Sequence, residues 1–246
     1  MVLVKFGFVR IGDTGNIVFV IIKNTPLAFF CLLAKTFANQ GVDVLTPLIQ
    51  YFVLVITVLL IHFLGSYYIF LTLFSTLNQF IFYKKLKQLL VFTFSTSSSN
   101  ASIPYTLDIV TRKYGVDKSF SSFSIPLGAT INMDGTAIMQ GCATYFLASY
   151  YGIALEFTDY LTIIATATLA SIGTAGIPSA GIIMLSIILE QIGIPLEGIA
   201  LLLGVDRLLD MMRTSVNVAG DTCISCIVAK SEGLINTKVF EDTSEN

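Results

Sequence analysis

The chain has 246 residues, of which 54% are hydrophobic and only 12% are charged, and its mean hydropathy is +0.81. A soluble domain of this length needs far less apolar surface, so the composition indicates an integral membrane protein. The net charge of −2 and the absence of a long basic run exclude nucleic acid as a partner.

The first part of the chain predicts two spanning helices within residues 17–72, whereas residues 1–16 fit no targeting pattern and stay unassigned. From Val44 to Tyr83 the sequence has no Lys, Arg, Asp or Glu. A helix of about 20 apolar residues is enough to cross the hydrocarbon core. His62 lies inside this run, where a satisfied or lipid-interface histidine is favoured over a proton carrier.

The region 73–233 reads as a transport core made of elements that are interrupted by polar or helix-breaking residues. The predicted elements are a hairpin over 75–113, a broken helix over 119–151, a second hairpin over 157–193, a last helix over 195–233 and a cytoplasmic tail over 234–246. Each hairpin carries Ser, Gly or Pro at its middle, and Asn132 and Gly135 weaken the broken helix. We therefore expect an unwound stretch at Asn132–Gly135.

Charge placement orients these elements. If the first helix starts in the cytoplasm, the basic residues at 84–87, 112–118 and 230 all fall inside, as the Lys/Arg bias of cytoplasmic loops requires. The predicted fold is an all-α, multi-pass protein of the cell (inner or plasma) membrane, with a cytoplasmic carboxy terminus. It combines spanning helices, two oppositely oriented re-entrant hairpins and an unwound helix. This inverted-repeat architecture is typical of a secondary transporter.

Polar residues on the last helix recur at spacings of four, three, four and four, so they share one helix face: Asp206, Asp210, Arg213, Asn217 and Asp221. A plain buried salt bridge between Asp210 and Arg213 is one interpretation. Together with Asp134, however, the face carries surplus negative charge. The surplus argues for bound cations.

The residue types predict sodium and an acidic amino acid as ligands. Sodium is a hard cation that prefers oxygens, which unwound backbone and the carboxylates of Asp134 and Asp221 would supply. The planar guanidinium of Arg213 matches a carboxylate, and Asp210 matches an ammonium group. The hairpin tip at Ser98-Ser99 would donate hydrogen bonds to a second carboxylate.

Four stretches in this order and spacing carry a family resemblance: the serine-rich run before Pro104, Asn132-Met133-Asp134-Gly135-Thr136, Ser171-Ile172-Gly173-Thr174-Ala175-Gly176-Ile177-Pro178, and Asp210-x-x-Arg213-Thr214-x-x-Asn217-Val218-x-Gly220-Asp221. They resemble the signature of the glutamate-transporter family, the dicarboxylate/amino acid:cation symporters. The resemblance runs from about residue 17 to 233. It implies the carboxy-terminal part of such a transporter, without the family's first four helices.

The resemblance also implies ligand sets. One sodium is expected among Gly128, Asn132, Asn217 and Asp221. A second is expected among backbone oxygens of Thr130, Ser171, Ile172 and Thr174, and a third at Asp134. The implied substrate contacts are Ser99, Thr136, Ile177, Gly181, Asp210, Arg213, Thr214 and Asn217.

The implied function is sodium-coupled symport by an elevator-like movement of the core, with no enzymatic activity and with the second hairpin as outer gate. Family members for C4-dicarboxylates lack the acid at Asp210, and carriers of neutral amino acids lack the arginine at Arg213. Aspartate or glutamate is therefore favoured over a dicarboxylate. The arginines that some members place at Ser97 or Met211 are missing here, which leaves the choice between the two amino acids open. Gln140 implies independence from potassium.

Two other interpretations remain. One is a truncated, inactive or partner-dependent remnant of such a transporter, whereas an intact assembly would be a homotrimer once the first four helices are supplied. The other is an intramembrane aspartyl protease, in which two aspartates share a proton. The sequence Val218-Ala219-Gly220-Asp221 departs from the Gly-x-Gly-Asp of such enzymes.

Overall fold

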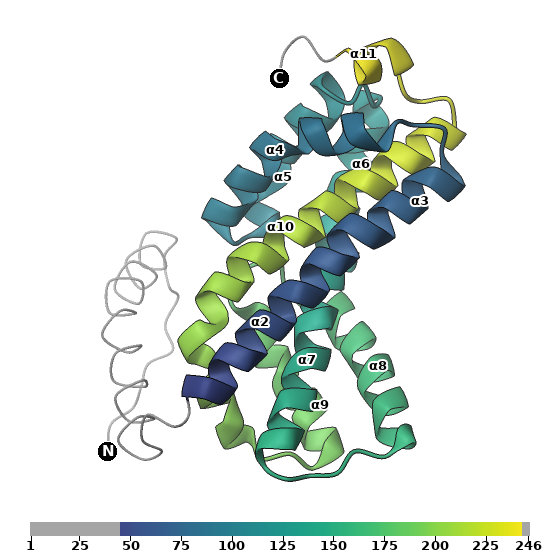
Figure 1. Cartoon of the computed structure of the whole chain (residues 1–246). Helices are drawn as coiled ribbons and strands as arrows, with labels where there is room; N and C mark the ends of the chain where they lie inside the picture. The colour runs from purple at the N-terminus through teal and green to yellow at the C-terminus, as the bar shows by residue number, and fades with distance from the viewer. Residues whose placement is uncertain (1–44, 243–246) are drawn as a thin grey trace, which may run out of the picture. The chain divides into compact units, whose positions relative to one another are not determined.

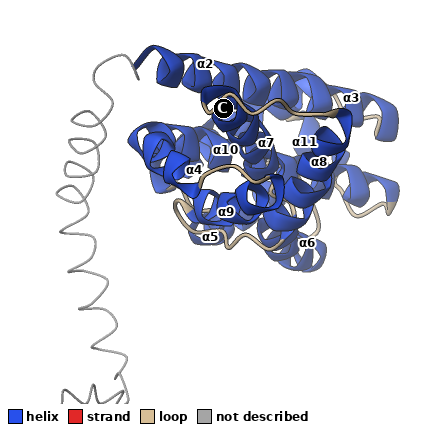
Figure 2. Ribbon diagram, turned by 90° about the horizontal axis from the view of Figure 1, so that it is seen from below, coloured by secondary structure: helices blue, strands red, loops and turns tan. Residues whose placement is uncertain are grey.

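A computed structural model describes residues 45–242 of the chain. The expectations for residues 1–16, for the first spanning helix and for the last four residues of the tail lie outside this part. Every regular element between residues 45 and 242 is a helix, and Figure 2 shows no strand there. The predicted all-α class is confirmed.

The first described element is one continuous rod of three helical segments: α2 (Leu45–Ile61), the π-helical turn η2 (His62–Ser66) and α3 (Tyr67–Phe74). Within residues 45–242 it is the one helix that is long and apolar enough to cross a membrane. Its buried stripe includes Tyr51, Val55, Leu59 and Leu71, while most of its remaining side chains point outward.

Two helix pairs occupy the positions of the predicted hairpins. The first is α4 (Gln79–Thr96) with α5 (Ser99–Arg112), and the second is α8 (Phe157–Ile172) with α9 (Ala180–Ile192). Asn78 and Ser98 cap the starts of α4 and α5 by accepting backbone N–H groups. Within residues 45–242, the non-glycine residues with positive φ are Ser97 and Ser179, one at the tip of each pair. Such backbone costs energy and concentrates at functional sites.

The broken helix is present as α6 (Lys118–Ile131) and α7 (Asp134–Tyr150). Asn132 and Met133 between them leave the helical region of φ/ψ, whereas Asp134 and Gly135, expected in the unwound stretch, belong to α7. Asp117 caps the start of α6 by accepting from the N–H groups of Ser119 and Phe120. The break interrupts the helical backbone at Asn132, which is half-buried, and at Met133, which is buried.

The longest helix, α10 (Ile199–Ser231), follows the short turn η3 (Leu196–Gly198) and forms the axis of the described part. It runs beside α2–α3, with α4, α5 and α6 around one end and α7, α8 and α9 around the other (Figure 1). A short helix, α11 (Thr237–Glu241), ends the described chain. The polar face of α10 is enclosed by the helices that it contacts, α2 to α7 and α9.

Large apolar side chains also cover much of the outer surface. Phe80 and Phe157 are each 76% exposed, and Leu73, Leu169 and Ile183 are about as exposed. A soluble protein rarely exposes so many large apolar residues, because contiguous apolar surface associates in water. This surface is therefore suited to contact with lipid.

Candidate functional site

A buried charge network lies in the first half of α10. Arg213 forms ion pairs with Asp210 and, at 3.5 Å, with Asp206, and all three side chains are almost fully enclosed. The Asp210–Arg213 pair that the sequence left open is thus present. It does not satisfy the network, because Arg213 Nη1 and Asp206 Oδ2 are buried without a hydrogen bond. Buried polar atoms without a partner are rare and call for a ligand or water.

All eight predicted substrate contacts surround one small cavity beside this network. Its wall contains Ser99, Thr136, Ile177, Gly181, Asp210, Arg213, Thr214 and Asn217, with Ser97, Met133, Thr174, Ala175 and Gly176. The cavity holds only about 10 Å³, which is about the space of one water molecule. The cavity is therefore closed in this structure, and a molecule larger than water enters only if part of the wall moves.

The tips of the two helix pairs meet at this cavity. Ser98 Oγ donates to the carbonyl of Gly176 at 2.7 Å, and the Asn100 amide donates to the same carbonyl at 3.1 Å. The Ser179 amide donates to Asp210 Oδ2 at 2.9 Å. These contacts join the loop between α8 and α9 to α5 and to the charge network, so this loop closes the site.

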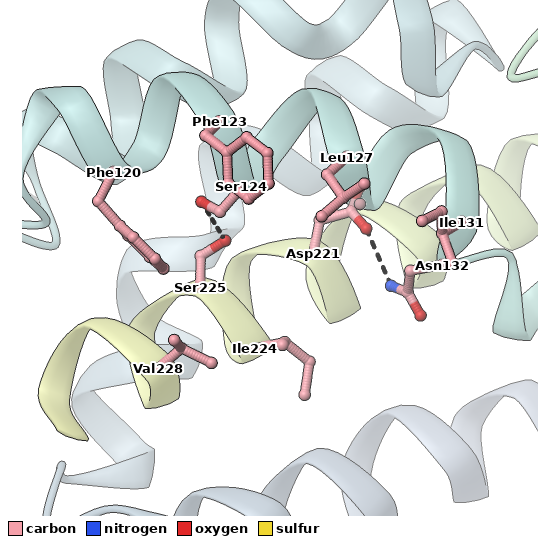
Figure 3. Close-up of a pocket in the computed structure, with 11 residues that line it drawn as sticks. Phe120, Phe123, Ser124, Leu127, Ile131, Asn132, Asp221, Ile224, Ser225 and Val228 are labelled. Carbon is pink, nitrogen blue, oxygen red and sulfur yellow. Dashed lines mark hydrogen bonds between the residues drawn. The ribbon is translucent and has the colours of Figure 1, made fainter. Parts of the chain in front are cut away.

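The first predicted sodium set is also brought together. Asn132 Nδ2 donates to Asp221 Oδ1 at 2.9 Å and to the Asn217 carbonyl at 3.2 Å. A Cβ on Gly128 would lie 2.6 Å from Asp221 Oδ1, so only glycine admits the carboxylate there. Figure 3 shows Asp221 and Asn132 in a groove of about 430 Å³ between α6 and α10, whose walls are otherwise mostly apolar.

The second predicted sodium set is less tightly joined. Ser171, Ile172 and Thr174 lie at the end of α8 and in the turn after it, whereas Thr130 lies at the end of α6. The hydroxyls of Thr130 and Ser171 donate to carbonyls of their own helices, and that of Thr174 donates to the Ala170 carbonyl of the preceding helix α8. Side-chain oxygens are thus engaged locally, which leaves backbone carbonyls as the available ligands.

The third predicted sodium residue, Asp134, has partners from the α2–α3 rod. Its Oδ2 atom accepts from Tyr67 at 2.5 Å and lies 2.7 Å from His62 Nε2, and its Oδ1 atom accepts from the Gly135 amide. Tyr67 also donates to the carbonyl of Val216 in α10 at 2.9 Å. His62, for which the sequence favoured a satisfied histidine over a proton carrier, thus contacts a predicted sodium residue.

Comparison with known proteins identifies the family of the chain. Residues 14–231 match the sodium:dicarboxylate symporter family, which is most of the chain. The chain belongs to this family.

Among curated proteins, this symporter-family chain is similar to transporters rather than to enzymes. It is 35% identical over 229 residues to an excitatory amino acid transporter of Caenorhabditis elegans, covering 92% of this chain and 46% of that protein. It is 41% identical over 224 residues to human excitatory amino acid transporter 2, covering 88% of this chain and 39% of that protein. Excitatory amino acid transporter 1 of Rattus norvegicus is 40% identical over 215 residues, covering 87% of this chain and 40% of that protein. The chain thus spans less than half the length of these relatives.

Several residues of this symporter-family site were missed from the sequence. Met133 contributes its sulfur, 3.3 Å from Asn217 Nδ2, and Ser97 and Gln140 each bury an oxygen without a hydrogen bond. Tyr67 and His62 hold Asp134. The signal for these last two was a lone histidine and a tyrosine five residues later in a charge-free run, which gives the residue types but not their partner.

A substitution at Gly176 tests whether the two tips must meet. In Gly176→Ala, the new Cβ would lie 2.7 Å from Asn100 Oδ1 and 3.1 Å from the Asn100 amide nitrogen. We expect the tips to separate and stability to fall by about 1–3 kcal/mol, as for other overpacked sites. Hydrogen exchange should show the Asn100 amide losing protection, since its acceptor is Gly176.

The matched control is Gly173→Ala in the same loop, where the nearest atoms are 3.7 Å from the new Cβ. Its Asn100 amide should exchange as in the unmodified chain. Equal protection of Asn100 in Gly176→Ala would show that the tips do not depend on this close approach.

Removing the Tyr67 hydroxyl tests the Asp134 cluster. Tyr67→Phe removes the hydrogen bonds to the Val216 carbonyl and to Asp134, so we expect a loss of about 1–3 kcal/mol in the free energy of unfolding. Tyr68→Phe, on the exposed side of the same helix, should change it by less than about 0.5 kcal/mol. Denaturation in detergent measures both, and equal losses would contradict the assigned role of Tyr67.

Proposed function

We propose that the chain carries the substrate and ion sites of a sodium-coupled symporter for an acidic amino acid, aspartate or glutamate. The observation that supports this most is the closed cavity that Arg213, buried with an Nη1 atom that makes no hydrogen bond, lines together with all the other predicted substrate residues. A buried, incompletely bonded guanidinium is matched by a carboxylate, which accepts two parallel hydrogen bonds from it.

The charges of the network favour an amino acid over a C4-dicarboxylate. When a substrate carboxylate binds Arg213, the Asp210 carboxylate loses its ion pair with that guanidinium and remains buried. A substrate ammonium group would replace that partner, whereas a dicarboxylate would bring only further negative charge. The substrate's second carboxylate would then lie at the start of α5, near Ser99.

Sodium enters the proposal as a co-substrate. The buried or partly buried residues Asp134, Asp206, Asp210 and Asp221 bring four carboxylates, against one buried guanidinium, Arg213. Sodium among Gly128, Asn132, Asn217 and Asp221, at the carbonyls near Ser171–Thr174 and at Asp134 would offset this surplus with oxygen ligands. The family's own description, sodium:dicarboxylate symporter, supports the choice of ion.

Coupling would operate through the loop that closes the cavity. The Ser179 amide donates to Asp210, and Gln140 Nε2 donates to the Gly181 carbonyl at 3.1 Å. Hydrogen bonds therefore connect the loop and the start of α9 to the residues around the cavity. Closure over a filled site would then permit the core to move across the membrane, since a ligand shifts an equilibrium by its differential affinity for the two states. As the family resemblance implies from Gln140, we propose that this cycle does not use potassium.

We place the chain in a membrane with its carboxy terminus in the cytoplasm. The apolar helix Leu45–Phe74, the exposed aromatic and aliphatic side chains and the relatives' identity as transporters support this placement. The two helix pairs would be re-entrant hairpins within the transport core 73–233. We keep the homotrimer as a proposal for an assembly in which the family's first four helices are supplied.

An aspartyl protease is not supported. A catalytic pair would have to share a proton between two carboxylates. Asp134 is bound by His62 and Tyr67, whereas Asp221 is bound by Asn132, so the two have separate partners.

The proposal is tested by the heat of L-aspartate binding to the detergent-purified chain, with and without sodium. Saturable binding that requires sodium is expected. If malate bound as tightly as aspartate, the proposed substrate would be a dicarboxylate rather than an amino acid. Absence of aspartate binding in saturating sodium, from a chain that still unfolds cooperatively, would overturn it in favour of an inactive or partner-dependent remnant.

A further inference from the structure

A basic cavity lies between α4 and α5, apart from the closed site. It has a volume of about 760 Å³, and four lysines line it: Lys84, Lys85, Lys87 and Lys113. No carboxylate lines it within the described part of the chain. A cavity with several ammonium groups and no acid attracts anions.

The four lysines differ in what they already bind. Lys85 is buried, and its ammonium group donates to the carbonyls of Lys113 and Val239, both at 2.7 Å. Lys113 donates to Gln88. Lys84 and Lys87 are exposed, and neither forms a salt bridge within residues 45–242. These two therefore bring positive charge that the described residues do not neutralise.

The polarity of the cavity changes along α4. One face of α4 carries, at helical spacing, Lys84, Lys87, Val91 and Ser95. The two charged side chains therefore lie at one end of this row and the two uncharged ones at the other. Val91 and Ser95 also line a second, almost wholly apolar groove of about 390 Å³, formed with α2, η2 and α10. The charged pocket and the apolar groove thus share Val91 and Ser95 in their walls.

We propose that this combined surface binds an anionic phospholipid, with the headgroup at Lys84 and Lys87 and one acyl chain passing Val91 into the apolar groove. A free phosphate ion would use only the charged end, and a neutral lipid only the groove, so an anionic amphiphile fits both parts. With the lysines on the cytoplasmic side, the site would face the leaflet that holds anionic lipids. This proposal rests on the membrane placement and is independent of transport.

The test counts bound lipid by native mass spectrometry of the delipidated full chain in detergent, titrated with phosphatidylserine or phosphatidylcholine. Two lysines at a membrane surface strengthen anionic lipid binding about 30-fold. We expect Lys84→Gln with Lys87→Gln to weaken phosphatidylserine binding by about that factor. Phosphatidylcholine should bind the unmodified chain at least about tenfold more weakly than phosphatidylserine.

A charge-matched control replaces two lysines elsewhere, Lys118→Gln with Lys230→Gln, and should change phosphatidylserine binding by less than about twofold. Equal loss in both double variants would overturn the site. Glycerophosphoserine and inorganic phosphate distinguish the sources of the anion. If either binds as tightly as the lipid, the cavity is a free-anion site and the proposal is wrong.

Discussion

Arg213→Ala is expected to abolish sodium-dependent aspartate binding. Removing one partner of a buried, hydrogen-bonded charge pair costs about 2–5 kcal/mol, which weakens binding at least about 30-fold. The variant also leaves Asp206 and Asp210 buried without their shared cation. Titration calorimetry with L-aspartate in saturating sodium measures the loss.

Arg207→Ala is the control for this result. Arg207 lies 4.0 Å from Asp210, but its side chain is half exposed. Water screens such a pair, so we expect less than a tenfold change. If Arg207→Ala lost as much affinity as Arg213→Ala, the carboxylate would be bound at the surface rather than in the closed cavity.

Asp221→Asn is expected to remove most of the sodium dependence of binding. The amide keeps the size of the side chain and the contact with Asn132, but it deletes the negative charge of the first sodium set. A pair of unit charges 4 Å apart is worth about 4 kcal/mol at an effective dielectric constant of 20. We expect the sodium concentration for half-maximal aspartate binding to rise at least about a hundredfold.

Two control variants sharpen this prediction. Asp108→Asn changes an exposed carboxylate that pairs with Arg112, and it should leave the sodium dependence unchanged. Gly128→Ala keeps every charge but forces the Asp221 carboxylate to move, so it should give a smaller rise, whereas Gly141→Ala, with open space at its Cβ, should give none. Unchanged sodium dependence in Asp221→Asn would place the coupling ion elsewhere.

Sequence reasoning succeeded where local spacing decides the structure. The residues from Asp206 to Asp221 share a face because α10 is regular, and Asn132 breaks its helix because the adjacent residues favour unwinding. The turns within the two helix pairs likewise fall where Ser, Gly or Pro interrupts an apolar stretch. These features depend on residues that are near one another along the chain.

Pairings between distant residues were beyond its reach. Asp134 meets His62 across 72 positions, and no periodicity connects them. The closure of the substrate cavity depends on how two tips from separate helix pairs pack, which spacing within either tip does not encode. Sequence therefore predicted residues that line one cavity, while the structure was needed to find what holds them.

The π-helical turn His62–Ser66 fixes the rotation of one end of the α2–α3 rod against the other. In a regular α-helix, residues 62 and 67 would point about 140° apart, whereas the wider turn brings both to the same carboxylate of Asp134. Deleting one residue within the turn would rotate α3 by about 100° relative to α2. Tyr67 and Leu71 would then leave the interior, so the length of this five-residue turn determines which side of α3 faces Asp134 and α10.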